Sequence, residues 1–396
     1  MNPTSRLSVK GFAAAAALVL VSVAITLVAA EFALRLATPS GYFIWKPHTS
    51  RTLVPAPGVM PGVSGESRFR TNSQGLRADE PSDKDGYRIL TLGGSTTECL
   101  YLDQAETWPQ LLQDELNAAP NAPHAWVGNA GMSGRNTRHH VLAMQHLPLQ
   151  EMKIDAVVLL AGINDLSIRL SQGDDYDPAA LRKPEVERRL VAETFLGLAA
   201  RGDPREPWFK RTVLWQLARN LKARWIPPPA ARGAQDEAGA IYNEWRRNRR
   251  EAGRIIRALP DMTSALDEYA RNIKEVATLA KARSVRLILV TQPTLWRPGL
   301  PPDLDALLWF GGVGDFQARP GHPYYSVEAL AEGIKRYNDV VLQACATEHL
   351  ECIDLSSLAK DTSVFYDDVH FNEAGARQVA GIVANHLKSR PPFAAR

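Results

Sequence analysis

The feature that most constrains the fold is a short apolar segment that runs directly into two glycines and a serine. Residues 89–92 are all apolar except for Thr91, a pattern typical of a strand buried in a parallel sheet. Gly93 and Gly94 lack a Cβ, so the backbone can turn sharply there and approach a ligand closely. Residues 108–116 then carry apolar side chains at helical spacing. The stretch predicts a strand–turn–helix unit with Ser95 at the carboxyl end of the strand, where open α/β sheets bind ligands.

Gly-Gly-Ser is also a common turn, so it does not define a site by itself. It is not a phosphate-binding loop, because the Gly-Lys-Ser/Thr ending is missing. It is not the Gly-x-Ser-x-Gly elbow of another hydrolase class, since Thr97 stands where the second glycine would be. Ser95 is therefore a candidate nucleophile whose support must come from the rest of the chain.

The alternation of apolar segments with helical patterns continues along the chain. Further strands are predicted near residue 126 and over residues 154–161, 285–291 and 350–355. Helices are predicted from about residue 137, over about 266–279 and over about 372–387. Strands that alternate with helices predict a three-layer α/β/α domain around a parallel sheet.

The N-terminus contains an uncharged run at residues 11–30, long enough to cross a bilayer. Arg6 and Lys10 precede it, so the N-terminus is expected in the cytoplasm and the remainder outside. Cleavage as a signal peptide after Ala30 is one interpretation. The run is longer than a usual signal core and apolar character resumes at residues 32–36, which favours an uncleaved anchor. We therefore predict a single-pass inner-membrane protein whose main domain faces the periplasm.

Composition divides the rest of the chain. Residues 1–37 form the cytoplasmic tip and anchor, and residues 38–80, rich in Pro, Gly, Ser and Thr, are expected to be a tether and lead-in. Within it, residues 69–77 are expected to form an ordered turn that braces the core. Residues 81–390 form the main domain, interrupted at about 167–260 by a largely helical insertion or cap.

The insertion is polar and rich in tryptophan and arginine. It contains Pro227 to Pro229. Its tryptophans can pack, stack on sugar rings or lie at a membrane interface, and they are Trp208, Trp215, Trp225 and Trp245. The arginines are expected to form a solvated helix face, paired in part with Glu244 and Glu251, and they are Arg246, Arg247, Arg249, Arg250, Arg254 and Arg257. A surface for anionic headgroups or acidic glycans is the alternative.

Candidate catalytic groups follow the predicted strands in chain order. Asp367 and His370 stand three residues apart before the last helix, so the carboxylate can orient the imidazole and stabilise its charged form. A serine becomes an effective nucleophile when a histidine takes its proton, which connects His370 to Ser95. Asp368 is also a neighbour of the histidine, but the Asp-x-x-His spacing favours Asp367.

Two further loops supply hydrogen-bond donors. Gly134 and Asn164 lie in the loops after the next two predicted strands, where a backbone N–H and a side-chain amide can meet. Together with the N–H of Ser95, these are the donors that a tetrahedral oxyanion requires. Ser95, Gly134 and Asn164 are therefore the predicted oxyanion hole.

These motifs together resemble the SGNH, or GDSL-type, hydrolase superfamily. Its blocks correspond to Leu-Gly-Gly-Ser-Thr-Thr-Glu at residues 92–98, Asn-Ala-Gly-Met-Ser-Gly-Arg-Asn-Thr at 129–137, Ala-Gly-Ile-Asn-Asp at 161–165 and Asp-Asp-Val-His at 367–370. Gly94 replaces the aspartate of Gly-Asp-Ser, as in the variety common among membrane-anchored bacterial members. The resemblance implies a flavodoxin-like fold and ester hydrolysis through an acyl-enzyme, without metal or cofactor.

The substrate is only partly constrained. Export and an aromatic insertion favour an O-acetyl group on an exported or cell-surface carbohydrate, such as an acylated polysaccharide. A lipid ester or thioester, transfer of the acyl group to a sugar hydroxyl, and glycan binding or assembly without turnover remain open. The net charge of +3 gives no reason to expect nucleic-acid binding. Cys345 and Cys352 can pair in an oxidising compartment.

Overall fold

The computed structural model describes residues 9–37, 42–118, 122–195, 207–215, 217–218 and 238–394. These residues fall into two units. Of these, the smaller unit contains residues 9–37, 207–215 and 217–218, and the larger one contains residues 42–118, 122–195 and 238–394. The larger unit carries all the candidate catalytic residues.

A five-stranded parallel sheet forms the centre of the larger unit, in the order β4-β3-β5-β7-β9. Its strands are β3 (Tyr87–Gly93), β4 (Ala125–Asn129), β5 (Ala156–Leu160), β7 (Arg286–Val290) and β9 (Glu351–Ile353). Numbered by their place in the chain, this order is 2-1-3-4-5, which is that of flavodoxin-like folds. The predicted fold class is confirmed.

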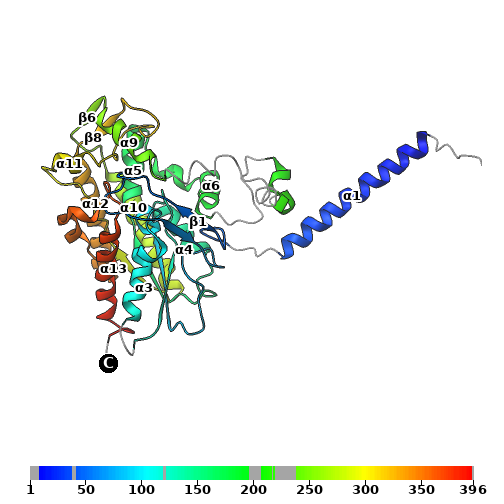
Figure 1. Cartoon of the computed structure of the whole chain (residues 1–396), viewed down its shortest axis with the longest axis horizontal. Helices are drawn as coiled ribbons and strands as arrows, with labels where there is room; N and C mark the ends of the chain where they lie inside the picture. The colour runs from blue at the N-terminus through cyan, green and yellow to red at the C-terminus, as the bar shows by residue number, and fades with distance from the viewer. Residues whose placement is uncertain are drawn as a thin grey trace, which may run out of the picture. The chain divides into compact units, whose positions relative to one another are not determined.

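Helices form the two outer layers (Figure 1). On one side α3 (Trp108–Asn117) packs against α13 (Glu373–Lys388). On the other side α10 (Thr263–Ala282) packs against both α4 (Thr137–His146) and α12 (Val327–Glu348). The helical predictions for α3, α4, α10 and α13 agree with these bounds.

The described residues also form shorter elements, of which η4 belongs to the smaller unit. The α-helices among them are α2 (Ser95–Glu98), α5 (Ile163–Gln172), α6 (Pro184–Thr194), α9 (Ile241–Arg250) and α11 (Pro302–Asp305). The 3-10 helices are η1 (Gln104–Glu106), η2 (Gly173–Asp175), η3 (Pro178–Arg182), η4 (Trp208–Arg211), η5 (Ser356–Lys360) and η6 (Thr362–Val364). A two-stranded parallel sheet joins β6 (Arg254–Ile256) to β8 (Pro323–Tyr325).

The lead-in to the domain is part of it rather than a tether. Strands β1 (Ser50–Leu53) and β2 (Ser67–Arg70) pair antiparallel, and the buried Trp45 donates from Nε1 to the Gly131 carbonyl at 3.1 Å. The expected tether over 38–80 is therefore wrong for residues 42–80, while 38–41 lie outside the described residues. Polar residues do not prevent packing where each finds a partner within the fold.

Arg77 shows how this lead-in braces the turn that carries Ser95. Its guanidinium is buried and donates to the carbonyls of Glu98 and Cys99 at 2.7 and 2.8 Å and of Leu102 at 2.7 Å. These carbonyls follow the turn that carries Ser95. Residues 69–77 were expected to brace the core, and Arg77 does so by donating hydrogen bonds to these buried carbonyls.

The arginines of α9 differ from their predicted role. Arg246 is buried and donates to the carbonyls of Val59, Leu307 and Tyr366, so it joins three loops. Arg249 donates to the carbonyls of Phe310 and Tyr325. Arg247, Arg250, Arg254 and Arg257 are exposed, as expected, and Arg247 lies 3.8 Å from Glu244. The solvated face is therefore wrong for Arg246 and Arg249.

Trp225 and Pro227 to Pro229 of the insertion lie outside the described residues, as does Arg6. Helix α1 (Val9–Ala37) is described and includes an apolar span, Ala13–Arg35, long enough to cross a membrane. By length and composition, this helix is compatible with a signal anchor or a single membrane span.

The sequence left the pairing of two cysteines open, and the structure joins them. Cys345 of α12 and Cys352 of β9 form a disulfide with their Cα atoms 6.1 Å apart. The bond links an outer helix to the edge strand of the sheet.

Candidate active site

Ser95 is the first residue of α2, and Gly94 alone separates it from the carboxyl end of β3. The two preceding glycines are required by close contacts rather than by unusual backbone angles. A Cβ on Gly93 would meet Thr97 and the Leu160 carbonyl, and one on Gly94 would meet the Asn164 amide. The small residues therefore let the serine turn lie against its neighbouring loops.

Ser95, His370 and Asp367 form one continuous chain of hydrogen bonds. His370 Nε2 lies 2.7 Å from Ser95 Oγ, and its Nδ1 lies 2.7 Å from Asp367 Oδ2. The other carboxylate oxygen, Oδ1, accepts the N–H groups of Val369 and His370 at 3.0 and 2.8 Å. The carboxylate is fully buried, so its orientation is fixed by these donors.

Trp309 completes the surroundings of Asp367, and sequence reasoning missed it. Its indole Nε1 donates to Asp367 Oδ2 at 3.0 Å, sharing that oxygen with His370. Trp309 belongs to an irregular segment, so no periodic pattern marks it. A tryptophan in a segment without periodicity is a weak signal on its own.

Asp368 has a different environment from its neighbour. Its Oδ1 accepts the Trp296 indole N–H at 2.8 Å. Its Oδ2 accepts the backbone N–H groups of Trp309 at 2.7 Å and Phe310 at 3.3 Å. Asp368 thus fixes the loop that presents Trp309 and does not touch the histidine ring.

The charges in this cluster shift one another. Burial disfavours the charged form of His370, but the Asp367 carboxylate more than offsets this, and the pKa of His370 is raised. Burial likewise opposes ionisation of Asp367, yet the imidazolium and the donors around it lower its pKa. Burial and the neighbouring Asp367 charge raise the pKa of Asp368 to about 6. The His370–Asp367 pair, next to Ser95, therefore favours a positively charged imidazole beside a negatively charged carboxylate.

The predicted oxyanion residues face the same cavity as Ser95. Gly134 has a φ of +75°, a conformation that favours glycine, and a Cβ there would meet no other atom within 4 Å. Asn164 donates one hydrogen of Nδ2 to the Arg135 carbonyl at 2.8 Å. Because an amide NH₂ carries two hydrogens, the second remains available to a ligand.

Two carboxyl groups hold the two ends of the loop that contains Gly134, at Ser133 and Thr137. Glu98, at the end of α2, accepts the N–H and hydroxyl of Ser133. Asp165, next to Asn164, accepts the N–H of Thr137 at 3.1 Å and its hydroxyl at 2.5 Å. Burial raises the pKa of Asp165 to about 7. Glu98 and Asp165 therefore fix the residues on either side of Gly134 by hydrogen bonds.

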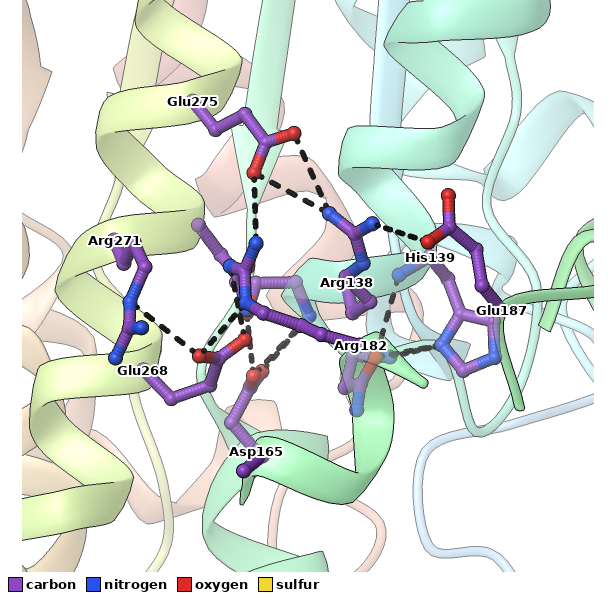
Figure 2. A network of polar contacts seen from close by, with 12 residues as sticks. Arg138, His139, Asp165, Arg182, Glu187, Glu268, Arg271 and Glu275 are labelled. Carbon is purple, nitrogen blue, oxygen red and sulfur yellow. Dashed lines mark hydrogen bonds and ion pairs between the residues drawn. The ribbon is translucent and has the colours of Figure 1, made fainter. Parts of the chain in front are cut away.

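Asp165 belongs to a larger polar network between α4, α5 and α10 (Figure 2). Asn272 donates to the Thr137 hydroxyl at 3.1 Å and accepts from Arg182 at 3.0 Å. Arg182 also lies 3.1 Å from Glu268 and 3.5 Å from Glu275. Through η3 and α6, this network connects the insertion to the helices behind the site.

A cavity of about 410 Å³ opens over these groups. One wall is aromatic and combines the insertion with the loop after β7, through Tyr242, Trp245, Trp309 and Phe310. Polar side chains line other parts of it, among them Ser167, Ser171, Asp315 and Gln317. Trp245 and Trp309 lie with their ring centroids 4.7 Å apart. Two residues of the predicted insertion, Tyr242 and Trp245, therefore line the cavity.

Two tyrosine rings pack against the His370 imidazole. The Tyr366 ring stacks on His370, with centroids 5.3 Å apart and planes 8° from parallel. Tyr242 meets the same ring edge-on at 6.3 Å. Both phenols are buried, which raises their pKa well above the usual value and keeps them neutral. The histidine ring is thereby fixed without an added charge.

A family comparison gives this geometry its context. The model of the GDSL-like lipase/acylhydrolase family matches residues 91–378, well over half of the chain. The chain belongs to the GDSL-like lipase/acylhydrolase family. It is therefore a hydrolase of the SGNH type, as the sequence motifs indicated.

Solved structures similar to this GDSL-like hydrolase are distant in sequence. Axe2, an acetylxylan esterase from Geobacillus stearothermophilus, is 13% identical, with 76% of this chain and 94% of that chain covered and a TM-score of 0.39. A lipase/acylhydrolase from Enterococcus faecalis is 15% identical, with coverages of 77% and 96% and a TM-score of 0.39. A search of curated proteins found no match.

Among the residues that the structure describes, no three His, Cys, Asp or Glu side chains lie together as a metal site. The polar groups that line the cavity with Ser95 in this GDSL-like hydrolase include His370, the Asn164 amide and the Gly134 backbone. Such a set suits acyl transfer through a serine oxygen.

Proposed function

We propose that the chain is a serine esterase that works through Ser95, His370 and Asp367. The observation that carries the proposal is the hydrogen-bonded sequence Asp367–His370–Ser95, which ends in the cavity lined by Gly134 and Asn164. Each residue has a separate role. Ser95 is the nucleophile, His370 is the base, and Asp367 orients the ring and stabilises its charged form.

In the first half of the reaction, Ser95 Oγ attacks the ester carbonyl as His370 Nε2 takes its proton. The carbonyl oxygen becomes an oxyanion that accepts from the N–H groups of Ser95 and Gly134 and from Asn164 Nδ2. The tetrahedral intermediate collapses, the bond to the alkoxy group breaks, and His370 returns the proton to the departing alcohol. An acyl-Ser95 ester remains.

In the second half, water takes the place of the alcohol. His370 accepts a proton from the water, whose oxygen attacks the acyl carbonyl under the same oxyanion donors. Collapse breaks the bond to Ser95 Oγ, which recovers its proton from His370. The products are the free acid and unmodified enzyme, so atoms and charges balance without a cofactor.

The proposed substrate is an O-acetyl group on an exported or cell-surface carbohydrate. The exposed parts of an aromatic wall that includes Trp245 and Trp309 suit contact with sugar rings. Ser167, Ser171 and Gln317 offer hydrogen bonds to hydroxyl groups in the same cavity. A long acyl chain would favour a groove lined throughout by apolar side chains. Because polar side chains also line this cavity, the cavity favours a short acyl group.

We also propose that α1 anchors the chain in the inner membrane with the larger unit in the periplasm. Lys10 precedes the apolar span, which favours a cytoplasmic N-terminus. The Cys345–Cys352 disulfide supports an oxidising compartment for the larger unit. Both observations favour a substrate outside the cytoplasm.

The test compares the full-length protein in detergent with its Ser95→Ala variant and with Ser389→Ala, which removes an exposed hydroxyl after α13. Substrates are p-nitrophenyl acetate, a long-chain p-nitrophenyl ester and an O-acetylated polysaccharide. Release of acetate from the polysaccharide that requires Ser95 and survives Ser389→Ala is expected. Preference for the long chain would replace the carbohydrate with a lipid. Hydrolysis of none of them by folded protein would point to acyl transfer or binding.

A further inference from the structure

A cluster of exposed aromatic side chains lies in the smaller unit, outside the catalytic domain. Trp208 is 73% exposed, Trp215 43% and Phe209 41%. Phe209 meets both tryptophans edge-on, with ring centroids 6.1 Å from Trp208 and 5.5 Å from Trp215. Large aromatic rings gathered on a surface, rather than scattered singly, indicate an interaction site.

The same segment is bonded to the anchor helix through one side chain. Glu31 of α1 accepts the backbone N–H of Val213 at 3.0 Å through Oε1 and that of Leu214 at 3.1 Å through Oε2. Arg35, one turn further on, donates to Glu31 Oε1 at 2.8 Å. The carboxylate therefore ties the aromatic cluster to a definite level of the helix.

That level corresponds to the far boundary of a bilayer. The apolar span begins at Ala13, and at about 1.5 Å per residue Glu31 stands about 27 Å along the helix from it. The hydrocarbon core of a typical bilayer is about 30 Å thick. A charged group is tolerated at this depth because its oxygens are hydrogen-bonded. Phe32, 65% exposed, lies at the same level of the helix.

We propose that residues 207–215 and 217–218 dock on the membrane surface, with Trp208 and Trp215 in the headgroup region of the leaflet where α1 ends. Indole rings prefer this region because they are apolar with one polar N–H. The proposal rests on α1 being a membrane anchor, as proposed above. It assigns the exposed rings a lipid partner rather than a protein or a glycan.

The docked segment changes how the chain is attached. It lies within the insertion, far along the sequence from α1, so the protein meets the membrane twice. The same insertion later supplies α9, whose Tyr242 and Trp245 line the catalytic cavity. The membrane contact and the cavity wall are thus parts of one inserted sequence.

The experiment places a fluorescent label at single positions of the full-length protein. Trp208→Cys is compared with Glu332→Cys, an exposed site on α12. The disulfide and the buried Cys99 leave the new cysteine as the reactive one. Each labelled protein is reconstituted into phosphatidylcholine/phosphatidylglycerol vesicles with or without brominated phosphatidylcholine, which quenches dyes that reach the lipid.

Quenching at position 208 at least threefold stronger than at 332 is expected, and equal quenching would overturn the proposal. Glu31→Ala in the Trp208→Cys background should reduce the quenching, because it removes the acceptor for Val213 and Leu214; no change would contradict the role given to Glu31. Alkaline carbonate extraction of the same vesicles reports anchoring separately. Extractable protein would overturn the anchor, whereas retained protein with an unquenched label would overturn the docking alone. Neither outcome touches Ser95-dependent hydrolysis, which is assayed in detergent.

Discussion

At the scale of single residues, two adjacent aspartates show how position decides chemistry. Asp367 accepts from the His370 ring, and Asp368 accepts from Trp296 and from the backbone of the Trp309 loop. Both are fully buried, so each is costly to leave without its donors. The Asp-x-x-His spacing predicted the pairing of Asp367 with His370 that the structure contains, but it gave no sign of the donors that surround Asp368.

Replacing the two aspartates separately should divide activity from stability. Asp367→Asn is expected to lower kcat by about 10³- to 10⁴-fold, because the amide favours the wrong tautomer of His370. Asp368→Asn should instead lower the free energy of unfolding by about 1–3 kcal/mol, since its NH₂ would face either the Trp296 indole N–H or the backbone N–H groups. Steady-state kinetics and denaturant unfolding measure the two effects. A larger kcat loss for Asp368→Asn would show that the pairing is misassigned.

The raised pKa of His370 predicts the acid limb of the pH profile. The base must be neutral to act, so kcat/KM should fall as the pH drops through a midpoint above the ordinary value of 6.5. In Asp367→Asn the midpoint should move down, because burial remains while the carboxylate is lost. The free energy of unfolding should change with pH in the opposite direction to kcat/KM. Protonated His370 stabilises the fold below pH 6.5, and this contribution is lost as the pH rises through the raised pKa. An unchanged acid limb in the variant would contradict the coupling.

At the scale of elements, the site is assembled where loops follow parallel strands. The loop after β4 carries Gly134 and the one after β5 carries Asn164, and the Arg135 carbonyl joins them. Sequence periodicity predicted these strands, and the carboxyl-edge rule predicted their convergence. The sequence did not predict that Glu98 and Asp165 fix the loop around Gly134, because these contacts form only through tertiary packing.

The support from Asp165 can be tested against another carboxylate of the same network. Asp165→Asn should lower kcat about tenfold with little change in KM, because Thr137 would lose an acceptor and the Asn164 amide its fixed position. Glu275→Gln is the matched control: Glu275 pairs with Arg138 and Arg182 but touches no oxyanion residue. The control should lose stability without losing kcat. Equal kcat losses in the two variants would assign Asp165 a purely structural role.

The aromatic wall of the cavity is the element that sequence reasoning did not find. Trp245 was visible as a tryptophan of the insertion, but its place opposite Trp309 depends on Arg246 and Arg249. These arginines bind backbone carbonyls of distant loops, so charge patterning alone suggested a solvated face. Buried arginines whose partners are carbonyls leave no counter-charge in the sequence to reveal them.

At the scale of the whole molecule, composition located the domain but misjudged its edges. Apolar segments predicted the strands of the sheet, and apolar residues at helical spacing predicted its helices. Residues 42–80 were mistaken for a tether because they are rich in turn-forming residues. Arg77 and Trp45 show that this segment is held by polar contacts with the core. Such contacts have no periodicity, and so composition could not distinguish them from solvent exposure.

The disulfide predicts a stability that depends on redox conditions. It closes a short loop between α12 and β9, for which chain entropy gives about 2–3 kcal/mol. Replacing both Cys345 and Cys352 by Ala should lower the free energy of unfolding by that amount. Reductant should destabilise the wild-type protein similarly and leave the double variant unchanged. A wild-type Tm that ignores reductant would show that the bond contributes nothing.

The central claim is that Ser95 is a nucleophile activated by His370, and covalent trapping tests it most directly. The full-length protein is treated with a fluorophosphonate, which labels activated serines, and the modified peptide is identified by mass spectrometry. We predict one label per chain, on Ser95, formed at least a hundredfold more slowly in His370→Ala and absent in Ser95→Ala. A label on another residue, or equal labelling of the Ser95→Ala variant, would contradict the account.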